Sequence, residues 1–222
     1  MSHPEQARRA AVSPASIRRR LLLSGAPAAL LPGGAWGAAA TAGHVEEVRG
    51  EVTAELASRS RMLIPPGEIF VGDAVATAEN ARAALRLGRD TLLRLGASAR
   101  VRIDRFIVNA GGVLNLEAGP LLLDKAPGGR DGPVQVRGAF GLITIRGTKI
   151  FVGPSQGVIG IFVVNGVITV AARGESFALQ TGEGTNIVLA GNGTSNRGLA
   201  AAPTQPAPWS EARIREAFAS VD

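Results

Sequence analysis

The chain has 222 residues, a net charge of +6, two histidines and no cysteine. The lack of cysteine excludes a disulfide framework, a thiolate metal site and a cysteine nucleophile, and the length suggests one domain, or one domain with appendages. Residues 1–42 carry five arginines against one glutamate, so the rest of the chain is nearly neutral, with 19 basic and 17 acidic residues. Charge therefore gives little support to nucleic-acid binding, and we expect no nucleic-acid partner.

Residues 1–42 have the three parts of a secretory signal peptide. Residues 18–20 are arginines, residues 21–31 are a short apolar stretch, and small residues allow cleavage near Ala40 or Ala42. The consecutive arginines before a weakly apolar run resemble a twin-arginine signal. We therefore predict an exported protein that resides in the periplasm.

An uncleaved anchor in the inner membrane is the alternative. The uncharged run of residues 21–43 is long enough to cross a bilayer. However, Pro27, Pro32 and five glycines make this run a poor membrane-spanning helix. We favour cleavage, and expect the protein to meet the membrane only through its export signal.

Residues 43–190 alternate between apolar and polar side chains and contain many turn signals, which predicts a β domain. The most regular part, residues 84–107, divides into three units of eight: ALRLGRDT, LLRLGASA and RVRIDRFI. Arg86, Arg94 and Arg102 each lie between two aliphatic residues, so they occupy the opposite sheet face. The units fit either hairpins or the rungs of a β-solenoid, and in stacked rungs the arginines would form one column.

The predicted fold class is all-β, with repetitive short strands in a β-solenoid-like or sandwich body and a short C-terminal helix. We count ten to fourteen strands between residues 44 and 189, where Asn165-Gly166 is the strongest hairpin signal. Residues 191–208 form a Gly/Ala/Pro-rich linker, and residues 209–222 form a helix that Ser210 can cap. Because an isolated helix of this length is marginal in water, it should dock on the β body or on a partner.

We predict no catalytic residue, cofactor site or metal site. The two histidines lie within or beside the signal peptide, which argues against a histidine-based triad or metal centre. Ser155 lies in a G-x-S-x-G sequence, but its flanks resemble strands, so we interpret the sequence as a turn. A pair of Ser155 with Lys149 is conceivable, although a solvated lysine is the simpler interpretation.

The arginine column, Arg86, Arg94 and Arg102, is a candidate face for an anion or a partner. Such a column could bind an anionic glycan or another polyanion. The simpler interpretation is a solvated sheet face whose arginines pair with Asp or Glu, because exposed charges contribute little. Both interpretations remain open from the sequence alone.

The order of motifs resembles the FecR-like domain, the periplasmic part of bacterial regulators of iron-citrate-type sigma factors. The resemblance covers about residues 45–188, and its most specific residues are Gly72, Asp73, Thr77, Arg146, Gly147, Thr148 and Phe151. In ITIRGTKIFV, these residues imply a strand, a sharp Arg-Gly-Thr turn or bulge, and another strand, which is a structural role. Lys149 departs from the acidic residue that the family usually has there.

The resemblance implies a domain that works by contacting other proteins. Family members that regulate sigma factors carry a cytoplasmic module before this domain, and only about seventeen residues precede the arginine cluster here. We therefore expect a stand-alone exported version of the domain, without enzyme activity, that serves signalling or assembly in the cell envelope. Its expected partner is another envelope protein, and the alternative is a module that binds an anionic envelope polymer through the arginine face.

Overall fold

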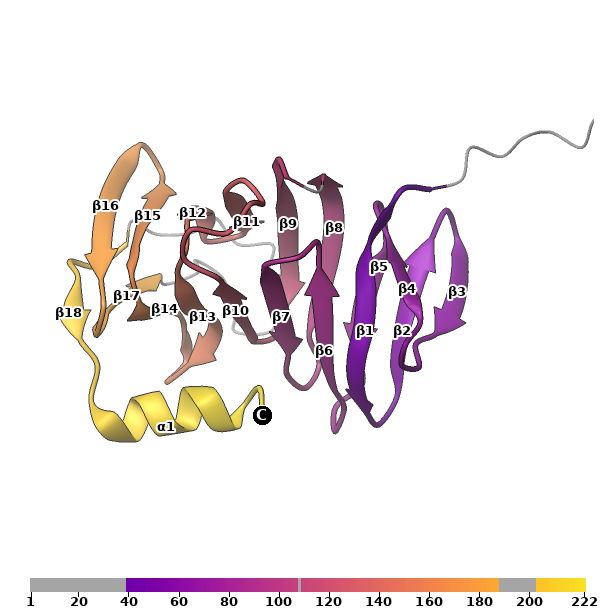
Figure 1. Ribbon diagram of the computed structural model, residues 1–222. Coiled ribbons are helices and arrows are strands. Elements are labelled where there is room, and N and C mark those ends of the chain that lie inside the picture. The colour runs from indigo at the N-terminus through magenta and orange to yellow at the C-terminus, as the bar shows by residue number, and fades with distance from the viewer. Residues whose placement is uncertain (1–38, 108, 188–202) are drawn as a thin grey trace, which may run out of the picture. The chain divides into compact units, whose positions relative to one another are not determined.

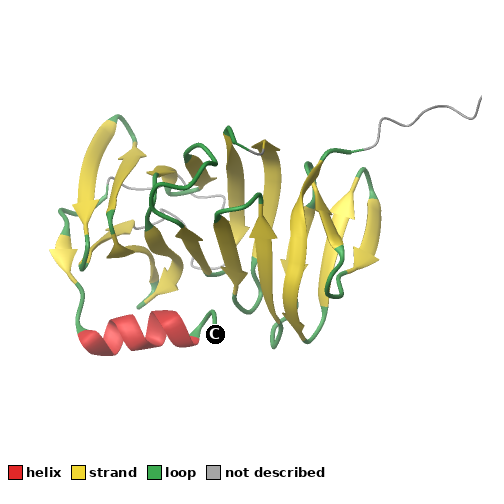
Figure 2. Ribbon diagram, in the orientation of Figure 1, coloured by secondary structure: helices red, strands yellow, loops and turns green. Residues whose placement is uncertain are grey.

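The computed structural model describes residues 39–107, 109–187 and 203–222. These residues form eighteen strands and one helix (Figures 1 and 2). Nearly all of the predicted signal peptide and residues 191–202 of the predicted linker lie outside the described residues. Within the described ranges, no helix combines the length and the apolar character that a membrane span requires.

The strands form two open nine-stranded sheets, which confirms the all-β prediction. Sheet I contains, in spatial order, β18 (Ala207–Pro208), β17 (Glu183–Ile187), β14 (Val158–Asn165), β13 (Lys149–Ser155), β10 (Leu121–Lys125), β7 (Thr91–Leu95), β6 (Arg82–Leu87), β1 (Thr41–Arg49) and β4 (Glu68–Phe70). Sheet II contains β16 (Glu175–Gln180), β15 (Val167–Ala172), β12 (Gly141–Ile145), β11 (Val134–Gly138), β9 (Gly111–Ala118), β8 (Arg100–Ile107), β5 (Ala74–Thr77), β2 (Val52–Leu56) and β3 (Arg59–Met62).

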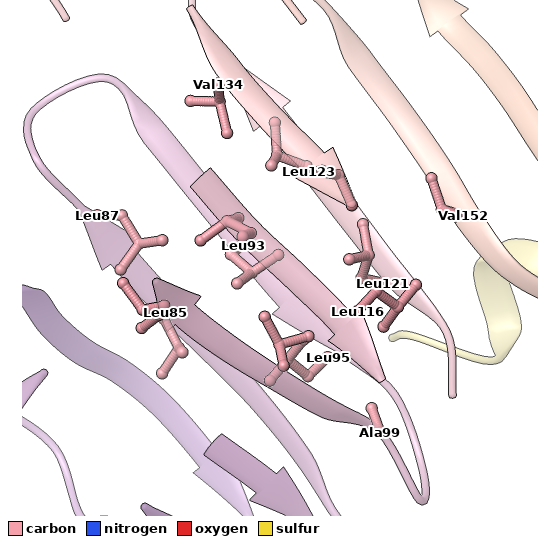
Figure 3. Packing of buried hydrophobic residues seen from close by; sticks show 14 of the residues in the cluster. Leu85, Leu87, Leu93, Leu95, Ala99, Leu116, Leu121, Leu123, Val134 and Val152 are labelled. Atoms are coloured by element: carbon pink, nitrogen blue, oxygen red, sulfur yellow. The ribbon is translucent and has the colours of Figure 1, made fainter. Parts of the chain in front are cut away.

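One hydrophobic core takes side chains from both sheets. Leu85 and Leu93 of sheet I are fully buried in it together with Leu114 and Val136 of sheet II. Figure 3 shows how the leucines of β6 and β7 lie close together within this core. Burying a Leu or Val side chain contributes about 1.5–3 kcal/mol. The alternation places apolar side chains on the inner face of each sheet, and their burial between the sheets stabilises the sandwich.

The chain moves back and forth between the sheets. The β6–β7 hairpin belongs to sheet I, the β8–β9 hairpin to sheet II, and β10 to sheet I again. Because β10 leaves for the other sheet, β9 and β11 become neighbours and pair in parallel. Of the two predicted architectures, the structure shows the sandwich.

The number of strands exceeds the predicted ten to fourteen, because β1 to β17 all lie between residues 41 and 187. Several of the strands have only three or four residues, such as β3, β4 and β5. A strand of three or four residues is too short to be recognised from its sequence, because the alternation of apolar and polar residues must repeat several times before it indicates a strand.

The C-terminal helix α1 spans Glu211–Ala219, within the predicted range of 209–222. Ser210 is its N-cap, and the Ser210 hydroxyl accepts a hydrogen bond from the backbone N–H of Arg213, as predicted. The predicted linker ends differently: β18 lies inside it and pairs with β17. That pairing brings the helix to the outer face of sheet I.

Candidate functional sites

The predicted column of Arg86, Arg94 and Arg102 does not exist. Arg86 lies on β6 and Arg94 on β7, both in sheet I, whereas Arg102 lies on β8 in sheet II. The predicted alternation is correct within each strand, because each arginine lies between two buried aliphatic residues. The stacking expectation is wrong because the chain changes sheet after β7.

Each of these arginines has an acidic partner. Arg86 Nε lies 2.7 Å from Glu46 Oε1, Arg94 Nη1 lies 3.0 Å from Asp222 Oδ1, and Arg102 Nε lies 3.3 Å from Glu117 Oε1. Their side chains are between one third and one half exposed, and such pairs contribute about 0–1 kcal/mol. The simpler interpretation, a solvated face with paired charges, describes them better than an open anion site.

The predicted signature residues gather at the crossings between the sheets. Asp73 follows β4 and precedes β5, where the chain passes from sheet I to sheet II. Its carboxylate is fully buried, accepts hydrogen bonds from Arg61 at 2.7 and 2.6 Å, and accepts another from the backbone N–H of Phe70. Hydrogen bonding to Asp73 raises the pKa of Arg61, although partial burial opposes the rise. Asp73 thereby ties the crossing to the edge strand β3.

Thr77 fastens a second crossing, between β7 and β8. Its hydroxyl donates to the carbonyl of Gly96 at 2.6 Å and accepts from the backbone N–H of Ala99 at 2.9 Å. Both groups are buried, and an unpaired backbone group there would be costly. Thr77 therefore supplies partners that the turn cannot find within a sheet.

The Arg146-Gly147-Thr148 tripeptide is a third crossing, from β12 of sheet II to β13 of sheet I. Gly147 has a φ of +67°, in the region that favours glycine. The buried Thr148 hydroxyl lies 3.1 Å from the carbonyl oxygen of Val167 and donates to it. The structure has a turn at the position where the motif predicts one.

Phe151 is not part of a crossing. It lies on the outer face of sheet I, where it packs beneath α1. It belongs to a second apolar cluster with Phe162, Trp209 and Ala217. Trp209 stacks on Phe162 at 5.1 Å, and the guanidinium of Arg213 lies 3.7 Å from the centre of the Trp209 ring. Burial lowers the pKa of Arg213, and Glu216 partly offsets this effect.

Ser155 and Lys149 do not form a catalytic pair. They lie at opposite ends of β13, about 20 Å apart at the rise of a β-strand. The Ser155 hydroxyl accepts a hydrogen bond from Arg213 Nε at 2.9 Å, and Lys149 Nζ lies 3.3 Å from Asp124. Gln156 and Gly157 form the turn to β14, so the turn interpretation of the G-x-S-x-G sequence holds.

The loop between β10 and β11, residues 126–133, was not among the sites predicted from the sequence. Asp131 accepts hydrogen bonds from the backbone N–H groups of Arg89, Asp90 and Asn109, and Asp90 accepts one from the N–H of Asp131. Burial alone would raise the pKa of Asp131, but these bonds and nearby Lys125 hold it below its usual value. The apolar strand LLLDK ending in a lysine was the available signal.

Among the residues that the structure describes, no group of three or more His, Asp or Glu side chains is arranged to hold a metal ion. The buried polar residues Asp73, Thr77 and Thr148 are engaged with backbone groups at the crossings. The fold and these crossings define an all-β sandwich domain whose crossings are held by buried polar side chains.

Residues 73–169 match the family model described as FecR protein. The match includes Asp73, Thr77, the Arg146-Gly147-Thr148 turn and Phe151, and it lies inside the predicted range of 45–188. The chain therefore contains a FecR domain, and the resemblance predicted from its motifs is confirmed.

Two crystal structures of a "putative anti-sigma factor" from Parabacteroides distasonis ATCC 8503 resemble this chain, with TM-scores of 0.49 and 0.48 and 14% identity. Each comparison covers 64% of this chain and 62% of that protein, so the similarity spans about three fifths of its length. No curated protein matches the chain in sequence.

Proposed function

We propose that this protein is a non-enzymatic regulator or assembly factor of the cell envelope that acts by binding another protein. The FecR domain at residues 73–169 supports a role in signalling. The proposal includes export to the periplasm through the N-terminal residues, which lie outside the described ranges. A partner protein would then be met on the surface of the sandwich.

The observation that carries the proposal is the apolar edge of sheet II. Met62, at the end of edge strand β3, is 58% exposed, and Ile64 just after it is 69% exposed. An edge strand presents unpaired backbone groups, and an extended segment of a partner can add to it as a further strand. Neighbouring exposed apolar side chains would provide contacts for that segment.

This edge is held in place by the family signature. Arg61 of β3 pairs with buried Asp73, and its guanidinium lies 5.1 Å from the centre of the Phe70 ring. A preorganised edge loses little freedom on binding, which favours affinity. The signature residue Asp73 thus positions edge strand β3, whereas the proposed contact surface is formed by Met62 and Ile64.

The alternative, an anionic polymer on the arginine face, has less support. Arg86 and Arg102 lie on different sheets, and each is paired with a glutamate. A polymer would have to displace those glutamates and bridge two sheets.

Site-specific photo-crosslinking in cells that natively make the protein tests the proposal. We expect a photoreactive amino acid at Met62 to give a discrete protein adduct in the envelope fraction. The same amino acid at Val167 of β15, which is 56% exposed, should give none and serves as the matched control. No adduct at Met62, or the same adducts from both positions, would contradict this contact surface.

A further inference from the structure

The loop between β10 and β11 borders a pocket that the proposed function does not use. The pocket has a volume of about 410 Å³, within the usual range for small-molecule sites. Residues 126–132 form one side of it, Lys125 lies at its start, and Arg146 and Gly147 complete the lining. The family's Arg-Gly-Thr turn is therefore part of its wall.

Lys125 is the unusual group in this lining. Its side chain is 2% exposed, and its ammonium group has no hydrogen-bond partner among the described residues. The nearest carboxylate oxygen, Asp90 Oδ2, is 3.7 Å away, which is an ion pair but longer than a hydrogen bond. A buried ammonium group with unused donors favours the approach of an acceptor.

A second unpartnered group lies beside it. Thr91 of β7 pairs with Lys125 of β10 across sheet I, and it is fully buried. Within the described part of the chain, the Thr91 hydroxyl also has no hydrogen-bond partner. Two neighbouring buried polar side chains without a hydrogen bond are unusual in a folded interior, where most such groups are satisfied.

The remaining charges of the lining favour an anion. Arg130 and Arg146 are exposed, and neither has an ion-pair partner among the residues that the structure places. Asp131 is the acidic residue of the lining, but its oxygens already accept three backbone hydrogen bonds. The lining therefore contains three cationic residues and one carboxylate, which is already engaged by backbone groups.

The walls are also fixed in position. The N–H of Lys125 donates to the carbonyl of Thr148 at 3.0 Å, which joins the loop to the Arg-Gly-Thr turn. The N–H of Ala126 donates to the carbonyl of Asp90 at 2.9 Å. Gly129 packs so closely on Asp90 that a Cβ atom would lie 2.3 Å from its carboxylate. A cradle held in this way needs little rearrangement to bind a ligand.

We propose that Lys125, Arg130 and Arg146 form a binding site for a small molecule that carries a carboxylate or phosphate group. The two exposed guanidinium groups would hold the anionic group by charge-assisted hydrogen bonds, and the ammonium group would bind it from the interior. Such a site would let a small metabolite act on the same domain that contacts a partner protein.

The test uses NMR titration of the exported chain with two probes, inorganic phosphate and succinate. We expect saturable shifts in the backbone amides of residues 126–132 and of Gly147 with at least one probe. The better probe indicates whether the natural ligand offers a phosphate or a carboxylate. A pocket that holds only water gives no saturable shifts with either probe, which overturns the proposal.

Paired variants decide whether the assigned side chains are responsible. The double variant Arg130→Gln and Arg146→Gln should weaken binding by about tenfold or more, because charge-assisted hydrogen bonds are lost. The double variant Arg137→Gln and Arg173→Gln removes the same charge from exposed positions outside the pocket and should bind as wild type does. Equal weakening in both would show general charge attraction and refute the site.

Lys125→Met provides the third variant. It should abolish the shifts, and a thermal melt shows whether the variant still folds. Because the arginine pair is exposed and should leave the fold intact, the proposal stays testable even if Lys125→Met unfolds the protein.

Discussion

Three buried polar residues of this protein bind backbone groups at points where the chain changes sheet. Asp73 accepts a backbone N–H, Thr77 serves the turn after β7, and Thr148 donates to the carbonyl of Val167. Crossing turns have backbone groups that no neighbouring strand can pair, and an unsatisfied buried group costs about 1–3 kcal/mol. These three residues therefore stabilise the crossings between the sheets.

Gly147 offers a sharp test at this scale. Gly147→Val should lower the free energy of unfolding by about 1–3 kcal/mol, because a β-branched residue is strained at a φ of +67°. A Cβ atom would also lie 3.0 Å from Pro127 Cα, so the loop would have to shift. Urea unfolding of wild type and variant measures the difference.

The adjacent Lys149→Ala variant is the control for Gly147→Val. Lys149 is 37% exposed, and its pair with Asp124 lies in solvent, so its removal should change stability by no more than about 0.5 kcal/mol. Equal stability of the Gly147→Val variant and wild type would rule out a strained turn.

Among the elements, α1 depends most on a single side chain. Trp209 lies over Gly160 and Gly184, where a Cβ atom would come within 2.5 and 2.1 Å of its ring. Because Gly160 in β14 and Gly184 in β17 have no side chains, the indole ring can pack directly against the backbone of these strands. The helix by itself is short, so packing contacts such as this one are needed to keep it docked.

Trp209→Ala should destabilise the protein by about 3 kcal/mol, because a buried aromatic side chain is lost and a cavity remains. In a chain that begins at Thr41, Trp209 is the only tryptophan, so its fluorescence reports on the docked helix. For wild type, we expect urea transitions followed by tryptophan fluorescence and by far-UV circular dichroism to coincide. An earlier fluorescence transition would show that α1 detaches before the sandwich unfolds.

The sequence predicted the strands and the helix better than it predicted which strands lie next to each other. Alternation is local, so it correctly placed Leu85 and Leu93 inward and Arg86 and Arg94 outward. It could not show that Arg102 belongs to the other sheet, because that depends on the turn at residues 96–99 and its contact with Thr77, about twenty residues earlier. The Lys125 pocket was missed for the same reason, since it combines β10, the loop after it and the turn at residue 146.

At the scale of the whole molecule, strand β1 favours one of the two cleavage sites that the sequence predicts for a signal peptide. Strand β1 begins at Thr41, Ala42 is 1% exposed, and its carbonyl accepts a hydrogen bond from the N–H of Gly88. Cleavage after Ala42 would delete two residues of this strand, whereas cleavage after Ala40 would leave it whole. We therefore expect the exported protein to begin at Thr41.

Mass spectrometry of the periplasmic protein checks this expectation. Replacing the arginines at positions 18–20 with glutamine should keep the chain in the cytoplasm at its full mass, because the export signal needs its positive start. Processed protein in the periplasm despite these substitutions would refute the signal assignment.

The position of α1 after both sheets in the sequence has a consequence for biosynthesis. Domains form from the N-terminus onward as the ribosome adds residues. Both sheets can therefore assemble while the outer face around Phe151 and Phe162 is still uncovered, since Trp209, Ala217 and Val221 arrive last. Asp222 then pairs with Arg94, 128 positions earlier. A nascent chain would therefore expose the apolar surface around Phe151 and Phe162 until residues 209–221 have been added.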